Sequence, residues 1–338
     1  MATKKKKDTS ATSLDDVMAA ANKVQGAGTI MMVGDCDLEV ERIPCGVLSV
    51  DLPLGGGFPR GKISELYGAE ASGKTSLSAR LAANVQGLGL KVLYVDAENA
   101  MNLDMLRSAG VNLGTLAISQ PGSGEQALEV VDLAVQADDV GLIVVDSVSA
   151  LTPAAEIAGD MGDSHMALQA RMMSQGMRKI NSTMIAHNSQ AIVVFINQIR
   201  ATIGGFGGNV TSGGRALKFY STVRLEVTRT GQIKAAGEDP HGHEVKIKVT
   251  KNRTAPPLRT GTFDMLYDRG ISNGSAILDL GTKVGTITQS GAWYVDATTG
   301  EKIGNGRKKS IDAIEDNAEL EQSLSEAITI AYNNAAVV

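Results

Sequence analysis

Apolar runs that end in turn or acidic residues, each followed by a helical stretch, repeat from about residue 62 to residue 197. Strands are expected at 62–67, 91–96, 141–146 and 191–197, and the last three are nearly continuous apolar runs rich in Val and Ile. Such runs are typical of strands that helices cover on both faces. Helices are expected near 75–86, 124–137 and 166–187. This βα repetition predicts an α/β fold with a mixed, mostly parallel sheet flanked by helices.

The pattern changes after Asn197, where a glycine-rich segment runs to Gly214. β-type runs follow around 222–229, 243–250 and 262–267, and we expect them to extend the sheet as antiparallel strands. From about Ile271 the chain turns to small polar residues, a hairpin around Thr299-Gly300 and two closing helical stretches. These features predict a small α/β domain at the C-terminal end.

A further helix is expected over 13–25, ahead of these elements. Leu14, Val17, Met18 and Ala21 recur at steps of three and four residues behind a Ser13-x-x-Asp16 start, which has capping-box spacing. The apolar face of this N-terminal helical arm requires a partner.

Composition narrows the class of protein. The chain has 338 residues, 43% of them hydrophobic, with 32 basic and 37 acidic residues and a net charge of −5. This balance excludes a wholly disordered chain and a collagen-like one, and it leaves any binding of nucleic acid to local clusters of Lys and Arg. Two cysteines make neither a disulfide framework nor a thiolate zinc site. Since no secretory or membrane-spanning apolar stretch is present, we expect a cytoplasmic location and no membrane partner.

A phosphate-binding motif lies between the first expected strand and its helix. Residues 68–75 read GAEASGKT, which matches G-x-x-x-x-G-K-[ST] in the strand-to-helix context that a P-loop requires. Its two glycines allow successive N–H groups to point at phosphate oxygens at the helix N-terminus. Lys74 is expected to neutralise the β- and γ-phosphates of ATP, and the Thr75 hydroxyl to bind Mg²⁺. The expected nucleotide-binding residues are Gly68, Ala69, Glu70, Ala71, Ser72, Gly73, Lys74, Thr75 and Ser76.

Polar side chains at the ends of three further strands complete this expected site. Asp146 follows an apolar strand and is the expected metal-supporting group beside Thr75. Asp96 and Glu98 are expected to share a face at a strand end, and Glu98, nearer the loop, is the candidate for activating the attacking water. Gln198 can hydrogen-bond the γ-phosphate and report its loss, although a strand-end Gln alone is also an ordinary surface amide.

The glycine-rich segment 199–215 combines backbone freedom with charge. It holds a single aromatic, Phe206, and has Arg200 and Arg215 near its ends. Freed backbone N–H groups, flanking cations and one apolar side chain suit binding of a sugar-phosphate chain without sequence preference, whereas a flexible linker is the alternative. The glycines expected to contact DNA are Gly204, Gly213 and Gly214.

Long ordered motifs beyond the P-loop carry a resemblance to a known family. They are 143–148 (IVVDSV), 162–166 (GDSHM), 170–175 (ARMMSQ), 195–200 (FINQIR), 216–220 (ALKFY), 291–294 (GAWY) and 300–304 (GEKIG). Through most of its length the chain resembles the bacterial RecA recombinases. The resemblance implies a DNA-dependent ATPase that forms helical filaments on single-stranded DNA, pairs it with homologous double-stranded DNA and exchanges strands in recombination, DNA repair and the SOS response.

The family pattern implies roles for individual residues in hydrolysis. Lys74, Glu98 and Gln198 act within one subunit. Lys251 and Arg253 match two basic positions that the family inserts into the neighbouring protomer's ATP site. The family usually has two lysines there, so Arg253 is a departure that keeps the charge. By spacing alone, both residues are solvated strand-end charges.

Other family positions concern DNA and adenine. The DNA-contacting role falls on Arg171, Arg178 and Met166, although Met166 is equally ordinary as core filler. Asn102 and Met105 stand where the family has an Asp and a Tyr that contact adenine, and Tyr267 across the interface is another source of that contact. The loop before Gly213 is about two residues shorter than the family pattern, and the basic run 307–309 is either a patch for a second duplex or a solvated turn.

The resemblance also implies an organisation and partners. We expect a polymerisation arm at 1–35, an ATPase core with DNA-binding loops at 36–270 and a small domain at 271–338. The N-terminal helix and Phe219 resemble protomer contacts. The implied partners are single- and double-stranded DNA, further copies of the chain in a head-to-tail polymer, and a self-cleaving repressor of the SOS response. A nucleotide-gated DNA-binding filament without strand exchange is the alternative function, and a ring-forming motor is a third possibility.

Overall fold

The computed structural model describes residues 13–26, 29–33, 39–160, 167–200, 210–234, 237 and 239–335, without the side chains of Arg200 and Val210. The chain divides into two units, Met1–Val40 and Glu41–Val338. In the first, α1 (Leu14–Gln25) begins after Ser13, whose side chain accepts a hydrogen bond from the Asp16 backbone N–H in a capping box. The expected helix and its start are therefore confirmed. None of its residues is buried, and Leu14 is 62% exposed.

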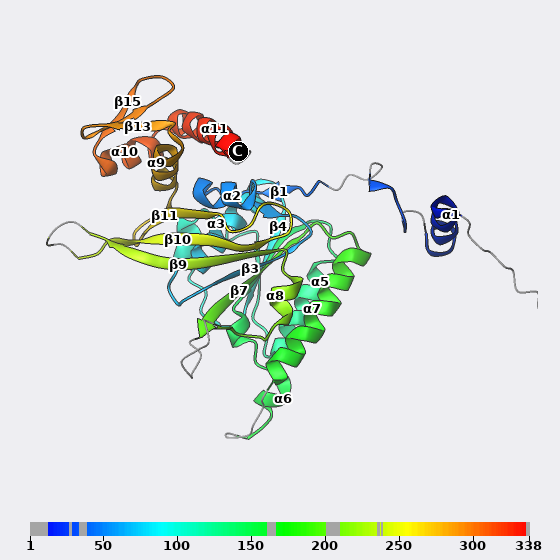
Figure 1. The fold of residues 1–338 in the computed structure, drawn as a ribbon. Coiled ribbons are helices and arrows are strands. Elements are labelled where there is room, and N and C mark those ends of the chain that lie inside the picture. Colours follow the sequence, from blue (N-terminus) through cyan, green and yellow to red (C-terminus); the bar gives the residue numbers. More distant parts are fainter. Residues whose placement is uncertain are drawn as a thin grey trace, which may run out of the picture. The chain divides into compact units, whose positions relative to one another are not determined.

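A large mixed sheet forms the centre of the second unit (Figure 1). In sheet order its strands are β12 (Gly270–Ser272), β11 (Thr260–Leu266), β10 (Gly242–Asn252), β9 (Val223–Ile233), β3 (Ile63–Gly68), β7 (Ile192–Arg200), β6 (Val140–Asp146), β4 (Lys91–Asp96) and β5 (Leu116–Ser119). The strands from β9 to β5 are parallel, and β10, β11 and β12 continue the sheet antiparallel. A short strand, β8 (Val210–Thr211), pairs antiparallel with β7.

The direction of β9 corrects the expectation from the sequence. An antiparallel extension is confirmed for β10 and β11, but it is wrong for β9, which runs parallel to β3. The reason is the connection: after β7 the chain passes through α8 (Ala216–Tyr220) and returns to the edge of the sheet where β3 begins. The edge strand β5 was not expected, because its apolar run, Leu116-Ala117-Ile118, is too short to stand out as a strand, and the strand is not buried.

Helices cover both faces of this sheet. α2 (Leu48–Leu54), α3 (Lys74–Gly87) and α4 (Leu103–Ser108) pack on one face, while α5 (Gly124–Ala134) and α7 (Leu168–Ala186) lie side by side on the other (Figure 1). Successive strand residues alternate between the two cores, so that Val144 faces α3 and Val145 faces α5 and α7. The three expected helices are confirmed as α3, α5 and α7. Shorter elements are β1 (Arg42–Ile43), β2 (Phe58–Pro59), α6 (Ala154–Ile157) and a 3₁₀ turn at Val148–Ala150.

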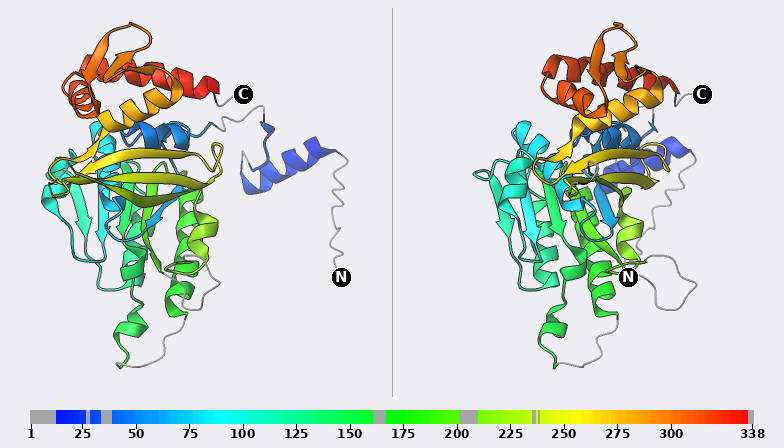
Figure 2. Two further views of the ribbon diagram at one scale, coloured as in Figure 1. Left: turned by 60° about the vertical axis from the view of Figure 1, so that its left-hand side comes forward. Right: turned by 90° about the vertical axis from the view of Figure 1, so that its left-hand side faces the viewer.

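The C-terminal part of the second unit carries a small sheet and three helices. They are α9 (Asn273–Val284), β13 (Ile287–Ser290), β14 (Trp293–Asp296), β15 (Lys302–Asn305), α10 (Arg307–Glu315) and α11 (Ala318–Ala335). The expected hairpin and the two closing helices are confirmed, since β14 pairs antiparallel with β15. Figure 2 shows this part, in orange and red, at one end of the unit beyond β11. Among the described residues, no helix has the length and apolarity needed to cross a bilayer.

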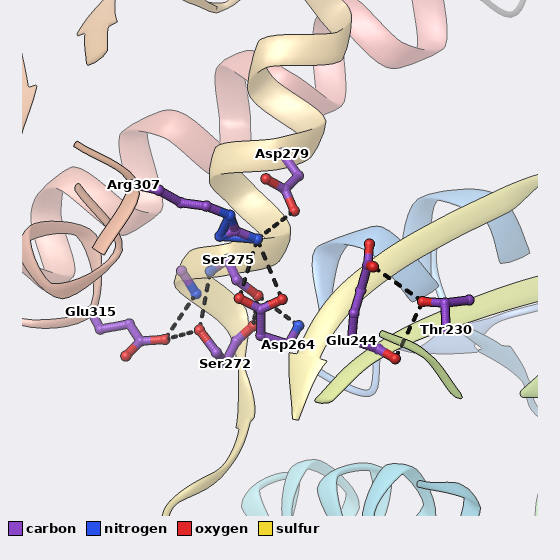
Figure 3. A network of polar contacts seen from close by, with 9 residues as sticks. Thr230, Glu244, Asp264, Ser272, Ser275, Asp279, Arg307 and Glu315 are labelled. Carbon is purple, nitrogen blue, oxygen red and sulfur yellow. Dashed lines mark hydrogen bonds and ion pairs between the residues drawn. The ribbon is translucent and has the colours of Figure 1, made fainter. Parts of the chain in front are cut away.

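Ion pairs and hydrogen bonds fasten this part to the large sheet (Figure 3). Arg307, at the start of α10, contacts Asp264 on β11 at 3.1 Å and Asp279 on α9 at 2.8 Å. Glu315, the last residue of α10, accepts hydrogen bonds from the Ser272 hydroxyl and from the Gly274 backbone N–H. Arg307 is therefore paired with carboxylates of its own chain, and the run 307–309 forms the first turn of α10 rather than a solvated turn.

Candidate functional site

The expected polar residues gather at one edge of the large sheet. β3, β7, β6 and β4 are neighbours, and because they are parallel their carboxyl ends meet at this edge. Strand pairing sets Gly68 beside Gln198 and Asp96 beside Asp146. Segments far apart in the sequence therefore deliver the P-loop, Gln198, Asp146 and Glu98 to one place.

The loop between β3 and α3 depends on its two glycines for different reasons. Gly73, the N-cap of α3, has φ +97°, in the left-handed region that side chains disfavour. A Cβ at Gly68 would overlap the carbonyl oxygen of Val227 on β9, so Gly68 is required by strand packing. In α3, which is described throughout, no side chain caps the N-terminus. The N–H groups of its first turn are therefore available to an anion such as phosphate.

Lys74 lies inside this loop and is 6% exposed. Its Nζ donates to the carbonyls of Gly68 at 3.2 Å and Ala69 at 2.6 Å, and to Ser72 Oγ at 3.4 Å. Burial lowers the pKa of Lys74, and Asp146 and Glu98 oppose that shift. Because the acceptors that hold this ammonium are neutral oxygens, an anionic phosphate oxygen would be a stronger partner.

Thr75 and Asp146 form a pair of oxygen ligands beside the loop. Thr75 Oγ1 donates to Asp146 Oδ2 over 2.9 Å. Burial raises the pKa of Asp146 to about 6, Glu98 and Asp96 add to the rise, and the Thr75 hydrogen bond and Lys74 oppose it. A divalent cation would offset this crowding of carboxylates, and Mg²⁺ prefers hydroxyl and carboxylate oxygens together with phosphate oxygens. The residues present therefore fit Mg²⁺, even though no cage of three acidic, His or Cys ligands occurs among the described residues.

Glu98 is held by two partners at the same edge. Its Oε1 accepts a hydrogen bond from Ser147 Oγ at 2.5 Å and a longer one from Gln198 Nε2 at 3.4 Å. Ser147 Oγ also lies 2.6 Å from Ser149 Oγ. The candidate water-activating carboxylate and the candidate γ-phosphate sensor are thus in direct contact. From the sequence alone no role was expected for Ser147, and its one signal is its position directly after the strand-end Asp146.

Asp96 has a different environment from Glu98. β4 ends at Asp96, so the expected common strand face does not extend to Glu98. The Asp96 carboxylate accepts hydrogen bonds from the backbone N–H groups of Ala100 and Met101 and from Gln120. Asp96 therefore fixes the loop that carries Glu98.

The candidate adenine contacts lie on separate elements. Asn102 is the N-cap of α4, and its Oδ1 accepts from the backbone N–H groups of Asp104 and Met105. Met105 packs against the core and, with Ser76, lines a small hollow of about 20 Å³. Tyr267 follows β11 and is 56% exposed, with its hydroxyl accepting from Arg229 at 3.2 Å. Asn102 is thus occupied with helix capping, while the Tyr267 ring is accessible.

Lys251 and Arg253 lie at and just beyond the end of β10. Lys251 Nζ donates to the last carbonyls of α8, those of Lys218 at 2.7 Å and Phe219 at 3.0 Å. Phe219 itself is 66% exposed. Burial lowers the pKa of Lys251 to about 8, with Arg253 and Arg224 contributing and Glu65 opposing. Among the described residues, no hydrogen bond or ion pair joins Lys251 or Arg253 to the P-loop.

The DNA-facing residues are described in part. Met166, Gly204 and Phe206 lie outside the described residues, as does the side chain of Arg200, the last residue of β7. Arg171 and Arg178 line a hollow on α7 together with Ser174. Gly213 and Gly214 have φ values of +79° and +77°, and a Cβ on either would press on Val148 or on Ala170 of α7. Arg215 precedes α8 as its N-cap.

Comparison with known proteins decides the family. A family model described as the RecA N-terminal domain matches residues 12–272, and one described as the RecA C-terminal domain matches residues 275–333. This chain belongs to the RecA family. Proteins named "Protein RecA" from Francisella tularensis subsp. novicida (strain U112), subsp. tularensis (strain WY96-3418) and subsp. mediasiatica (strain FSC147) are each 45% identical over 321 residues, covering 94% of this chain and 88% of the relative.

Family membership supplies the activity. The chain is a RecA-type recombinase with DNA-dependent ATPase activity, which binds nucleotide and DNA, assembles with its own copies into filaments, and acts in strand exchange, DNA repair and the SOS response. The matched C-terminal model extends the resemblance beyond the P-loop core that many ATPases share.

Proposed function

We propose that each ATP is held by residues 68–76 of one subunit and that its hydrolysis is completed by Lys251 and Arg253 of the next. The observation that carries this proposal is the convergence of phosphate-binding, metal-binding and water-activating side chains at one sheet edge. They are Lys74, Thr75, Asp146, Glu98 and Gln198. Lys251 and Arg253 lie apart from that edge. A site with anion binders, metal ligands and a carboxylate within one chain then lacks only the cations that stabilise charge in the transition state.

The chain's own residues divide the work at this edge. The first-turn N–H groups of α3 and Lys74 bind the phosphates, and Thr75 and Asp146 hold Mg²⁺, which supplies positive charge to the phosphate oxygens. Glu98, oriented by Ser147, accepts a proton from the attacking water. Gln198 donates either to Glu98 or to a γ-phosphate oxygen, so loss of that phosphate changes its hydrogen-bond partner. Gln198 lies near the end of β7, just before the segment 201–209, so this change can reach that segment.

Cations supplied by a neighbour couple hydrolysis to assembly. Their positive charge reaches the transition state only where two subunits meet, in the same way as an arginine finger supplied by a partner protein. A head-to-tail contact that does not close generates a helical polymer. The exposed Phe219, whose carbonyl helps to hold Lys251, is a suitable protomer contact beside these cations.

The roles proposed for the other residues are those that the family pattern implies. We propose that Met166, Arg171, Arg178, Arg200, Gly204, Phe206, Gly213, Gly214 and Arg215 contact DNA, and that Asn102 and Tyr267 contact adenine. The proposed organisation is an arm at 1–35, a core at 36–270 and a small domain at 271–338. A cytoplasmic location and a self-cleaving repressor as partner complete the proposal.

Mixed filaments test the shared site. Glu98→Gln keeps the phosphate loop and the cations but loses the water-activating carboxylate, whereas Lys251→Ala keeps Glu98 but loses a cation. Each variant alone should hydrolyse little ATP on single-stranded DNA. In a random equimolar mixture, about a quarter of the junctions join an intact Glu98 to an intact Lys251, so turnover should return to about a quarter of the wild-type rate.

The mixing ratio provides the control for this experiment. Restored turnover should be greatest near equal amounts of the two variants and fall away on either side. If the mixture hydrolyses no more ATP than the sum of its two components, the proposal of a shared site is wrong.

A further inference from the structure

A partly buried polar bridge joins the P-loop strand to the end of the strand that carries Lys251. We propose that Glu65, Arg224 and Tyr67 position Lys251 through Thr250, and so connect a subunit's own nucleotide site to the site that it completes on its neighbour. This inference rests on the proposed function, because it takes Lys251 as a cation delivered to the next subunit.

The bridge starts from a buried carboxylate. Glu65, on β3, is 0% exposed, and its Oε2 pairs with Arg224 Nε of β9 at 2.5 Å. Its Oε1 accepts from Asn197 Nδ2 of β7 at 3.0 Å. A carboxylate removed from water requires such partners, so the guanidinium of Arg224 is held in one place. Three neighbouring strands are thereby fixed around Glu65.

Tyr67 carries the contact from this ion pair to β10. The Arg224 guanidinium lies over the Tyr67 ring at 4.4 Å, and the Tyr67 hydroxyl donates to Thr250 Oγ1 at 2.9 Å. Thr250 Oγ1 in turn donates to the Arg224 backbone carbonyl at 3.2 Å. One hydroxyl of β10 is thus fastened to both β3 and β9.

Thr250 lies where the pairing of β10 with β9 is irregular. Val249 pairs with Leu225 and Lys251 with Arg224, so Thr250 is an extra residue between two successive partners. Bulges of this kind redirect the side chains that follow them. The hydroxyl contacts of Thr250 therefore hold the geometry that aims Lys251. Among the described residues, Lys251 Nζ itself donates to the neutral carbonyls of Lys218 and Phe219 in α8.

The other end of the bridge lies at the nucleotide site. Tyr67 directly precedes Gly68, the first P-loop residue, and pairs with Asn197, which directly precedes Gln198. Asn197 Nδ2 also donates to the Ser212 carbonyl at 3.1 Å, beyond the segment 201–209. A displacement at the P-loop or at Gln198 therefore has a short covalent and hydrogen-bonded route to Thr250 and Lys251. Glu65, Arg224 and Tyr67 are positioning residues, since they act through Lys251.

Placing Tyr67→Phe in one subunit type of the mixed filament tests this inference. The variant keeps the ring under Arg224 and removes the hydroxyl that holds Thr250. Added to the Glu98→Gln subunit, which donates Lys251, it should lower the restored turnover about three- to tenfold, as expected for one lost hydrogen bond. Added to the Lys251→Ala subunit, which supplies the working P-loop, it should have a clearly smaller effect.

Further variants separate positioning from general destabilisation. Thr250→Val in the donating subunit should reproduce the loss, and Thr250→Ser, which keeps the hydroxyl, should restore turnover. Tyr294→Phe, in the C-terminal part, is the matched control and should change neither arrangement. Equal losses in both subunit types, or a larger loss in the P-loop subunit, would overturn the bridge while leaving the shared site intact. If the mixture of Glu98→Gln and Lys251→Ala subunits restores no turnover even when Tyr67 is intact, the shared site itself is refuted, and the bridge with it.

Discussion

Lys251 shows how one residue's surroundings set the conditions under which it works. Burial, Arg253 and Arg224 lower the pKa of its ammonium to about 8, against the partial opposition of Glu65. In a single subunit the cationic form is therefore lost as pH rises through about 8. A neighbour's phosphates favour the charged form, so turnover that depends on Lys251 should fall at or above that pH. Lys251→Arg keeps a positive charge throughout this range, so its alkaline decline should begin at higher pH. The pH dependence of ATP hydrolysis on single-stranded DNA measures the difference.

A rise in pH is expected to act in opposite directions on the stability of the fold and on turnover. Since the folded state holds the Lys251 proton less tightly than the unfolded chain, the unfolded state binds more protons between about pH 8 and the unperturbed pKa of 10.5. The contribution of this residue to the free energy of unfolding therefore rises with pH in that window. A decline in turnover that coincided with unfolding, or that was the same in Lys251→Arg, would contradict the assignment.

At the scale of the element, the apolar pattern predicted what local sequence can encode. The buried strands β4, β6 and β7 and the helices α3, α5 and α7 follow from their periodicity, and their polar ends placed Asp146 and Gln198 at one edge. Features that depend on distant partners could not be predicted. Gly68 is required by Val227, the bulge at Thr250 depends on Leu225 and Arg224, and the direction of β9 depends on a chain reversal through α8.

The contact between α10 and the large sheet gives a prediction at the same scale. Arg307 pairs with Asp264 and Asp279, and burial raises the pKa of both carboxyls while Arg307 opposes that rise. Arg307→Met leaves two partly buried carboxylates without this cation, and should lower the free energy of unfolding by about 1–2 kcal/mol at neutral pH. The loss should diminish as pH falls toward the raised pKa values, because protonated carboxyls no longer need the cation.

Urea unfolding near pH 5 and near pH 8 measures this pH dependence. Arg307→Met combined with Asp264→Asn is the control, since it removes one of the stranded charges and should recover part of the stability at the higher pH. A destabilisation by Arg307→Met that is independent of pH would show that packing of the side chain, not its charge, fastens α10.

For the whole molecule, a net charge of −5 means that a DNA strand is not attracted by the chain in general, so binding must rest on a small number of cations. Each phosphate contact releases counterions, and the logarithm of the affinity for single-stranded DNA falls linearly with the logarithm of salt concentration. Arg200→Ala, at the end of β7, should reduce the magnitude of that slope by about 0.7.

Arg107→Ala is the matched control, because its guanidinium is exposed on α4 and paired with Asp104 at 2.7 Å. Fluorescence anisotropy of a labelled oligonucleotide across a salt series measures both slopes in the presence of nucleotide. An unchanged slope for Arg200→Ala would remove this residue from the phosphate-contacting set. A slope equally reduced by Arg107→Ala would mean that the filament responds to its total charge rather than to a defined DNA path.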